Sequence, residues 1–143
     1  KEGFDFLGMH HRRMRTETRQ GRSFNETYQY PSRKAMKKMK TTIKANVNSR
    51  SLLVATEEDL IKNLNPKIIG WRNYYRTRTS RKWLQALDWY IICTFTRWYN
   101  KKHQRRSHLS KVGYVRNSIY EKGLKKMATT RRNASEEECR KAV

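Results

Sequence analysis

The sequence has 143 residues, and its 34 Lys and Arg against 12 Asp and Glu give a net charge of +22. Such a charge favours a polyanionic partner, nucleic acid before an acidic membrane surface, and the length allows one compact domain with a tail. No apolar run approaches the roughly 18 residues of a membrane span, and the two cysteines, without a Cys-x-x-Cys pair, argue against a disulfide framework or a zinc site. Because the chain starts at Lys1 rather than Met, we expect it to be part of a longer polypeptide.

The front of the chain predicts a short β-hairpin. Gly3–Gly8 alternates apolar and polar residues and indicates one strand, and Thr27–Tyr30 indicates a returning strand, with a loop around Gly21 between them. Ser32 then follows the hairpin as a candidate helix N-cap.

A strongly basic amphipathic helix is predicted from Ser32 to about Val47. Its apolar residues recur at spacings of three and four and so share one stripe. They are Met36, Met39, Ile43 and Val47. No carboxylate occurs on this helix, so no internal ion pair relieves the repulsion among its lysines. We therefore favour a phosphate-facing surface over a merely solvated one.

The region after this helix predicts two short helices in succession. Thr56, with Asp59 three residues later, has the pattern of an N-cap. Asn65 and Pro66 are expected to interrupt this helix, with Asn65 capping a new helix that runs to about Arg76.

The second of these helices interleaves aromatic with basic and amide side chains. Trp71 is assigned to the core, Tyr74 is left open between packing and stacking on a base, and Arg72 is expected to face outward to phosphate. Gly70 costs about 1 kcal/mol in a helix relative to Ala. We expect close approach of another helix at that position.

The longest predicted helix runs from about Arg81 to Lys102 and carries a long apolar stripe. The stripe contains Leu84, Leu87, Ile91, Phe95 and Trp98. Asp88 falls near it and is expected to pair with Arg72 or a backbone group rather than act in catalysis. Beyond this helix the pattern is weaker, with a short helix expected around Val115–Met127. The prediction is a mainly α fold, a small helical bundle preceded by a short β-hairpin.

Signatures of an enzyme are weak in this chain. Asp5, Asp59 and Asp88 lie in separate segments, whereas a two-metal site needs carboxylates gathered around the ions. Cys93 with His103 is conceivable as a nucleophile pair, but Cys93 falls opposite the apolar stripe and we do not favour it.

Three segments resemble the reverse transcriptases encoded by group II introns. Phe4–Gly8 resembles the closing strand of their palm, and Pro31–Ala35 resembles the start of their thumb. The most specific match is Leu64–Arg76, with the sequence LNPKIIGWRNYYR, which is similar to the maturase-specific signature. The resemblance covers about residues 3–108.

This resemblance implies the end of the palm at residues 1–30, a thumb or domain X at 31–108, and a basic C-terminal extension at 109–143. The thumb of that family grips intron RNA to promote splicing and mobility, and it holds the template–primer duplex beside the palm and fingers domains upstream. The parent would be an RNA-directed DNA polymerase in a ribonucleoprotein of the bacterial cytoplasm or an organelle. The Tyr-x-Asp-Asp motif of the palm is absent here, so we expect no catalytic residue and no cofactor in this chain, Mg²⁺ being needed by the parent polymerase and the ribozyme.

The predicted RNA-binding side chains lie mainly in two basic segments. Residues 31–55 hold seven basic and no acidic residues, and residues 81–108 hold seven basic and one acidic residue. The predicted set is Arg12, Arg13, Arg33, Lys34, Lys37, Lys38, Lys40, Lys44, Arg72, Asn73, Tyr74, Arg76, Arg78, Arg81, Lys82, Arg97, Lys101, Lys102, His103, Arg105 and Arg106. Two alternatives stay open, which are a general RNA-binding module of ribosomal-protein type and a DNA target-site domain that uses residues 109–143.

Overall fold

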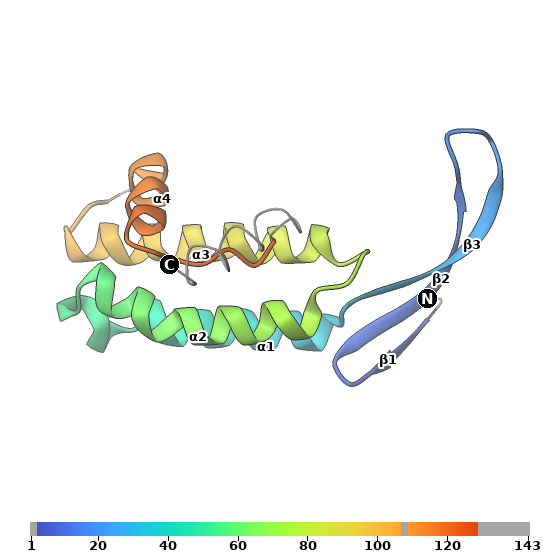
Figure 1. Cartoon of the computed structure of the whole chain (residues 1–143). Helices are drawn as coiled ribbons and strands as arrows, with labels where there is room; N and C mark the ends of the chain where they lie inside the picture. The colour runs from blue at the N-terminus through green and yellow to red at the C-terminus, as the bar shows by residue number, and fades with distance from the viewer. Residues whose placement is uncertain (1–2, 107–108, 129–143) are drawn as a thin grey trace, which may run out of the picture.

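The computed structural model describes residues 3–106 and 109–128, and it places a helical bundle beside a small antiparallel sheet (Figure 1). The elements in chain order are β1 (Phe4–Phe6), β2 (Met9–Glu17), β3 (Ser23–Pro31), α1 (Arg33–Val47), the 3-10 helix η1 (Arg50–Val54), α2 (Glu57–Tyr75), α3 (Arg81–Lys102) and α4 (Val112–Glu121). The predicted mainly α fold with a small β element in front is confirmed. None of the helices in the described part is both long and apolar enough to cross a bilayer.

The sheet has the order β1-β2-β3, and both pairs of strands are antiparallel. In the longer pair Met9 lies opposite Pro31 and Glu17 lies opposite Ser23. The predicted pairing of the first strand with the returning strand is therefore wrong, because β2 lies between them. The basic sequence of β2 lacks the apolar alternation that is typical of a strand packed on a core. Figure 1 shows the β2–β3 hairpin curving away from the helices.

Two of the three predicted helix N-caps, Ser32 and Thr56, are confirmed. The Ser32 hydroxyl accepts a hydrogen bond from the Ala35 backbone N–H at 3.2 Å and begins α1. The Thr56 hydroxyl accepts from the Asp59 N–H at 3.3 Å and begins α2. Each bond satisfies a donor that the first helical turn leaves without a partner.

The predicted break at Asn65 and Pro66 is wrong, because α2 runs through both residues as one helix. Pro66 removes a single backbone donor, whereas Leu60, Leu64 and Ile68 are completely buried along one side of the continuous helix. Burial of that stripe outweighs the lost hydrogen bond. The Asn65 side chain caps no helix and instead bonds the chain that follows α4.

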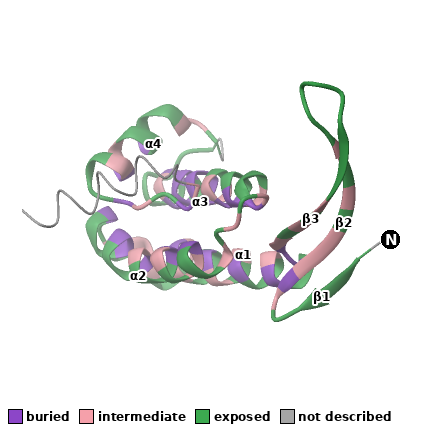
Figure 2. Cartoon of the chain, turned by 45° about the vertical axis from the view of Figure 1, so that its right-hand side comes forward, coloured by how far each residue is buried: buried purple, intermediate pink, exposed green. Residues whose placement is uncertain are grey.

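The core lies between the helices, and it extends beyond the boundary at residue 108 that we expected. Figure 2 shows buried positions on the facing sides of the helices, while most of the sheet is exposed or intermediate. Val115, Ile119 and Met127 are completely buried in the same cluster as the side chains of α1–α3. The bundle therefore continues at least to Met127, and the rest of the expected extension, 129–143, lies outside the described residues.

Helix α4 is shorter than the predicted 115–127 because Gly123 ends it. Gly123 has φ +99°, a conformation that favours glycine. Its N–H donates to the Tyr120 carbonyl, and the Leu124 N–H donates to the Ile119 carbonyl, which is the Schellman pattern of a helix C-terminus.

Gly70 lies on the exposed side of α2, and a Cβ built there would meet nothing within 4 Å, so the expected close approach of another helix is wrong. Gly70→Ala should raise the free energy of unfolding by about 0.5–1 kcal/mol, because glycine inside a helix loses extra backbone entropy on folding. Urea denaturation measures the change. Gly21→Ala is the matched control, since Gly21 also faces open space but has φ +76°, and it should lower stability. Equal or lower stability of Gly70→Ala would contradict the prediction.

Candidate nucleic-acid interface

An open basic groove of about 900 Å³ runs along α1 and is bounded by residues of α3 and β1. Its lining residues are Asp5, Arg33, Lys34, Met36, Lys37, Lys40, Thr41, Lys44 and Tyr90. Helix α1 places these cations on one side because its apolar stripe, which includes Met39, Ile43 and Val47, is turned into the core.

The groove is strongly positive. Five of its lining side chains are Lys or Arg, and α1 itself carries no acid. Among the described lining residues Asp5 is the one acid, and its Oδ1 lies 2.6 Å from Nδ1 of His10. The lysines therefore have little opposing charge within the groove, and an anionic ligand would relieve their mutual repulsion.

The aromatic side chain in the groove was missed as a site residue. Tyr90 lies at the edge of the apolar stripe of α3, where its spacing alone does not distinguish a core position from a surface position. In the structure the ring is partly exposed in the groove, and Lys40 Nζ lies 5.5 Å from its centroid. Only the packing of α1 against α3 brings these two residues together.

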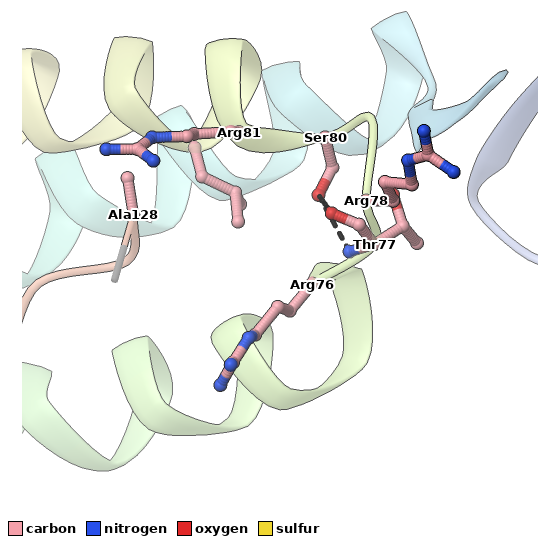
Figure 3. A pocket seen from close by; sticks show the side chains of 7 residues that line it. Arg76, Thr77, Arg78, Ser80, Arg81 and Ala128 are labelled. Atoms are coloured by element: carbon pink, nitrogen blue, oxygen red, sulfur yellow. Dashed lines mark hydrogen bonds between the residues drawn. The ribbon is translucent and has the colours of Figure 1, made fainter. Parts of the chain in front are cut away.

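A second concave site lies at the turn between α2 and α3, where a pocket of about 480 Å³ is lined by three arginines (Figure 3). Arg76 ends α2, Arg81 begins α3 and Arg78 lies in the turn between them. Arg78 Nε is 3.4 Å from a Glu26 carboxylate oxygen on β3. In Figure 3 the Arg81 side chain extends toward Ala128, the Arg76 side chain runs along the α2 ribbon, and Arg78 points away from both.

This turn is hydrogen-bonded to the sheet, and these bonds fix the position of the bundle relative to the strands. The Thr77 and Thr79 hydroxyls donate to the Gln29 carbonyl, and the Gln29 N–H donates to the Thr79 hydroxyl. Nearby, the Tyr30 and Trp83 rings stack with centroids 3.8 Å apart. The position of the turn is therefore set by side chains from both parts of the molecule.

Tyr74 also contacts the sheet. Its side chain is exposed, but its hydroxyl donates to the Leu7 carbonyl at 2.5 Å, and its ring lies edge-on to that of Tyr75. These contacts give Tyr74 a structural role in joining α2 to the β1–β2 turn.

Arg72 is not on the surface, which corrects the prediction that it faces phosphate. It is 9% exposed, and its Nη1 donates to the Lys126 carbonyl at 3.1 Å. The helical spacing places Arg72 on the side of α2 that packs against the C-terminal chain, which was not visible from the motif alone. Trp71 packs against the core but is only partly buried.

Asp88 pairs with backbone N–H groups, which confirms one of the two partners predicted for it. Its two carboxylate oxygens accept from the N–H groups of Met127 and Ala128 at 2.8 and 3.0 Å. Burial raises the pKa of Asp88 above its ordinary value, and the two hydrogen bonds offset part of this shift. Asp88 thus holds the C-terminal chain against α3.

The basic end of α3 makes contacts within the bundle. Lys101 Nζ donates to Asn48 Oδ1 at 3.1 Å, and Lys102 Nζ donates to the Ala55 carbonyl at 2.6 Å while lying 5.0 Å from the Trp98 ring centroid. These two lysines bind the linker that joins α1 to α2.

The other predicted site residues are not gathered by the structure into either concave site. Arg12 is partly buried on β2. The exposed ones are Arg13, Lys38, Asn73, Lys82, Arg97, His103, Arg105 and Arg106. Burial raises the pKa of the Cys93 thiol, which disfavours the thiolate that a nucleophile requires.

Comparison with known families identifies the chain. The family described as Group II intron, maturase-specific domain, matches residues 36–114, more than half of the sequence. The chain belongs to this family. A search of curated proteins and a search of solved structures each returned no match.

The family match covers most of both concave sites of this maturase-specific domain. It spans most of α1, all of α2 and α3 and the start of α4, and it includes the motif Leu64–Arg76 that carried the sequence resemblance. Membership supports a role as a group II intron maturase and implies group II intron RNA as the partner.

Proposed function

We propose that this chain is the RNA-binding thumb of a group II intron reverse transcriptase, where it grips intron RNA to promote splicing and mobility and holds the template–primer duplex. In this proposal the chain binds and positions RNA, while the intron supplies the ribozyme chemistry and a palm domain supplies polymerase chemistry. Residues 1–30 would then form the end of that palm.

The observation that carries the proposal is the basic groove along α1. A folded RNA or an A-form duplex is recognised through phosphates, 2′-hydroxyls and shape rather than through bases in its deep groove. A rigid helix with several cations on one side suits that task, since lysines contact phosphates without selecting a sequence. Thr41 adds a hydroxyl to the same surface.

The test replaces Lys34, Lys37 and Lys44 together by Gln in the full chain. We expect affinity for a transcribed group II intron RNA to fall about 100-fold at physiological salt, and the slope of log affinity against log salt to decrease in magnitude by about two to three, since three phosphate contacts are lost. Filter binding across a salt series measures both quantities.

The charge-matched control replaces Lys38, Lys62 and Lys67 by Gln. These lysines are exposed on α1 and α2 but do not line the groove, so the control should keep most of the affinity and slope. Equal losses in both triple variants would contradict a role for the groove. Equal wild-type affinity for intron RNA and transfer RNA would favour a general RNA-binding module, and tighter binding of duplex DNA would favour a DNA target-site domain.

A further inference from the structure

The pocket at the turn between α2 and α3 contains two arginines whose side chains show no structural role in the described part of the fold. Within the described residues the Arg76 and Arg81 side chains have no hydrogen bond and no ion pair, whereas Arg78 is paired with Glu26. Both free guanidinium groups belong to side chains that line the same concavity (Figure 3). Two like charges that share a pocket whose lining contains no acid repel each other, and a bound anion would relieve this repulsion.

The turn that carries these arginines is rigid. Ser80 is completely buried, and its hydroxyl accepts from the Thr77 N–H at 2.9 Å and donates to the Thr77 carbonyl at 3.2 Å. Contacts of the same turn with Gln29 fix it to β3. The spacing between the end of α2 and the start of α3 is therefore set before any ligand binds, so little ordering entropy is lost on binding.

The remaining wall of the pocket is built by the chain that follows α4. We call residues 123–128 the C-terminal strap. Three side chains of α2 and α3 hold it, since Asn65 bonds Gly123 and Lys125, Arg72 bonds Lys126, and Asp88 bonds Met127 and Ala128. This places Ala128 at the pocket, together with the arginines of the turn.

We propose that this pocket binds a phosphate group of the RNA backbone, with Arg76 and Arg81 as its two guanidinium forks and the Leu84 side chain as an apolar wall beside the ribose. Guanidinium groups bind phosphate oxygens through paired N–H donors, which gives them more geometric selectivity than lysines have. A volume of about 480 Å³ is suitable for one nucleotide unit. The inference rests on the proposed function and adds a discrete phosphate site to the more diffuse groove along α1.

The first experiment compares Arg76→Gln/Arg81→Gln with the charge-matched Arg19→Gln/Arg22→Gln in the full chain, using the transcribed intron RNA and a short RNA duplex as probes; Arg19 and Arg22 are exposed and do not line the pocket. We expect the first pair to lower affinity roughly 10- to 30-fold and to decrease the salt slope by about 1.5–2, and the control pair to change affinity less than about threefold. Arg76→Lys/Arg81→Lys keeps the two positive charges but loses the paired N–H donors of the guanidinium groups. Its affinity should therefore lie between those of the wild type and of Arg76→Gln/Arg81→Gln.

The second experiment maps arginines directly. Phenylglyoxal modifies accessible arginines, and mass spectrometry reports which ones react. Bound RNA should protect Arg76 and Arg81 and leave Arg19 reactive. Circular dichroism should show all variants folded, since the side chains of Arg76 and Arg81 make no hydrogen bond within the described residues.

Three results would overturn the phosphate site. Equal affinity losses in the two arginine pairs, or no protection of Arg76 and Arg81 by RNA, would each do so while leaving the α1 groove result intact. Glu136→Gln/Glu137→Gln/Glu138→Gln tests the acidic run of the chain itself as the occupant. If that variant makes Arg76 and Arg81 more reactive without RNA, the pocket binds the carboxylates of its own tail. Failure of the proposed function is distinct, because then the α1 lysine variants also leave RNA binding unchanged.

Discussion

Trp98→Ala should lower the free energy of unfolding by about 3–5 kcal/mol, which is a large share of the stability of a domain this size. Trp98 is 1% exposed, and it is among the largest completely enclosed side chains of the core. Its indole N–H also donates to the Leu52 carbonyl in η1 at 2.9 Å. The substitution removes the buried ring and leaves that carbonyl without its donor, so a cavity and a lost hydrogen bond add together.

Trp89→Ala is the matched control for this prediction. Trp89 lies on the same helix, but its side chain is 54% exposed and belongs to no buried cluster in the described chain. Its replacement should change the free energy of unfolding by no more than about 0.5 kcal/mol. Urea denaturation followed by circular dichroism at 222 nm compares both variants. Similar destabilisation by the two substitutions would refute the assignment of Trp98 to the core.

The starts of α1 and α2 and the buried stripe of α3 could be predicted because each depends on local signals that survive in the fold. Ser32 and Thr56 satisfy helix donors within their own turn, and the stripe of α3 from Leu84 to Trp98 is buried as its spacing predicts. These features involve residues at most a few turns apart. No knowledge of tertiary contacts is needed to find them.

Two of the features that sequence reasoning missed depend on contacts between distant segments. Pro66 was expected to end a helix, yet burial of the stripe on either side carries α2 through it. Arg72 was expected on the surface because its motif is rich in cations, but the C-terminal strap covers it. Local propensity favours the expected structure in both cases, and tertiary packing overrides it.

In the candidate site, too, some residues could be predicted from local sequence and others depend on tertiary contacts. The cations of α1 could be predicted as one surface because they share a helix face. Tyr90 could not be predicted as part of that surface, because an aromatic residue at the edge of an apolar stripe can lie either in the core or in a groove. The pocket of Arg76 and Arg81 was predicted only as separate basic residues, because its shape depends on the turn contacts with Gln29 and on the strap that positions Ala128.

Asp88→Ala should lower the free energy of unfolding by about 2–4 kcal/mol and release the C-terminal strap. The substitution leaves the N–H groups of Met127 and Ala128 without acceptors in a partly buried place, and it removes the carboxylate near the buried Arg72. Amide hydrogen exchange should therefore speed up at Met127 and Ala128 well before the helices open. Glu121→Ala, an exposed carboxylate at the end of α4, is the control and should leave exchange in the strap unchanged.

Asp88→Asn tests how the contribution of Asp88 to the free energy of unfolding depends on pH. Because burial raises the pKa of Asp88 in the folded protein, the folded state holds this proton more tightly than the unfolded state does. The contribution of Asp88 to stability is therefore fully present below the unfolded pKa, about 4, and declines as the pH rises through the folded pKa. Asn does not titrate, so the stability difference between wild type and Asp88→Asn should be larger at pH 4 than at pH 7. Urea denaturation at both pH values measures this difference, and a difference that grows toward pH 7 would show that the ionised carboxylate, through its bonds to the strap, outweighs the cost of its burial.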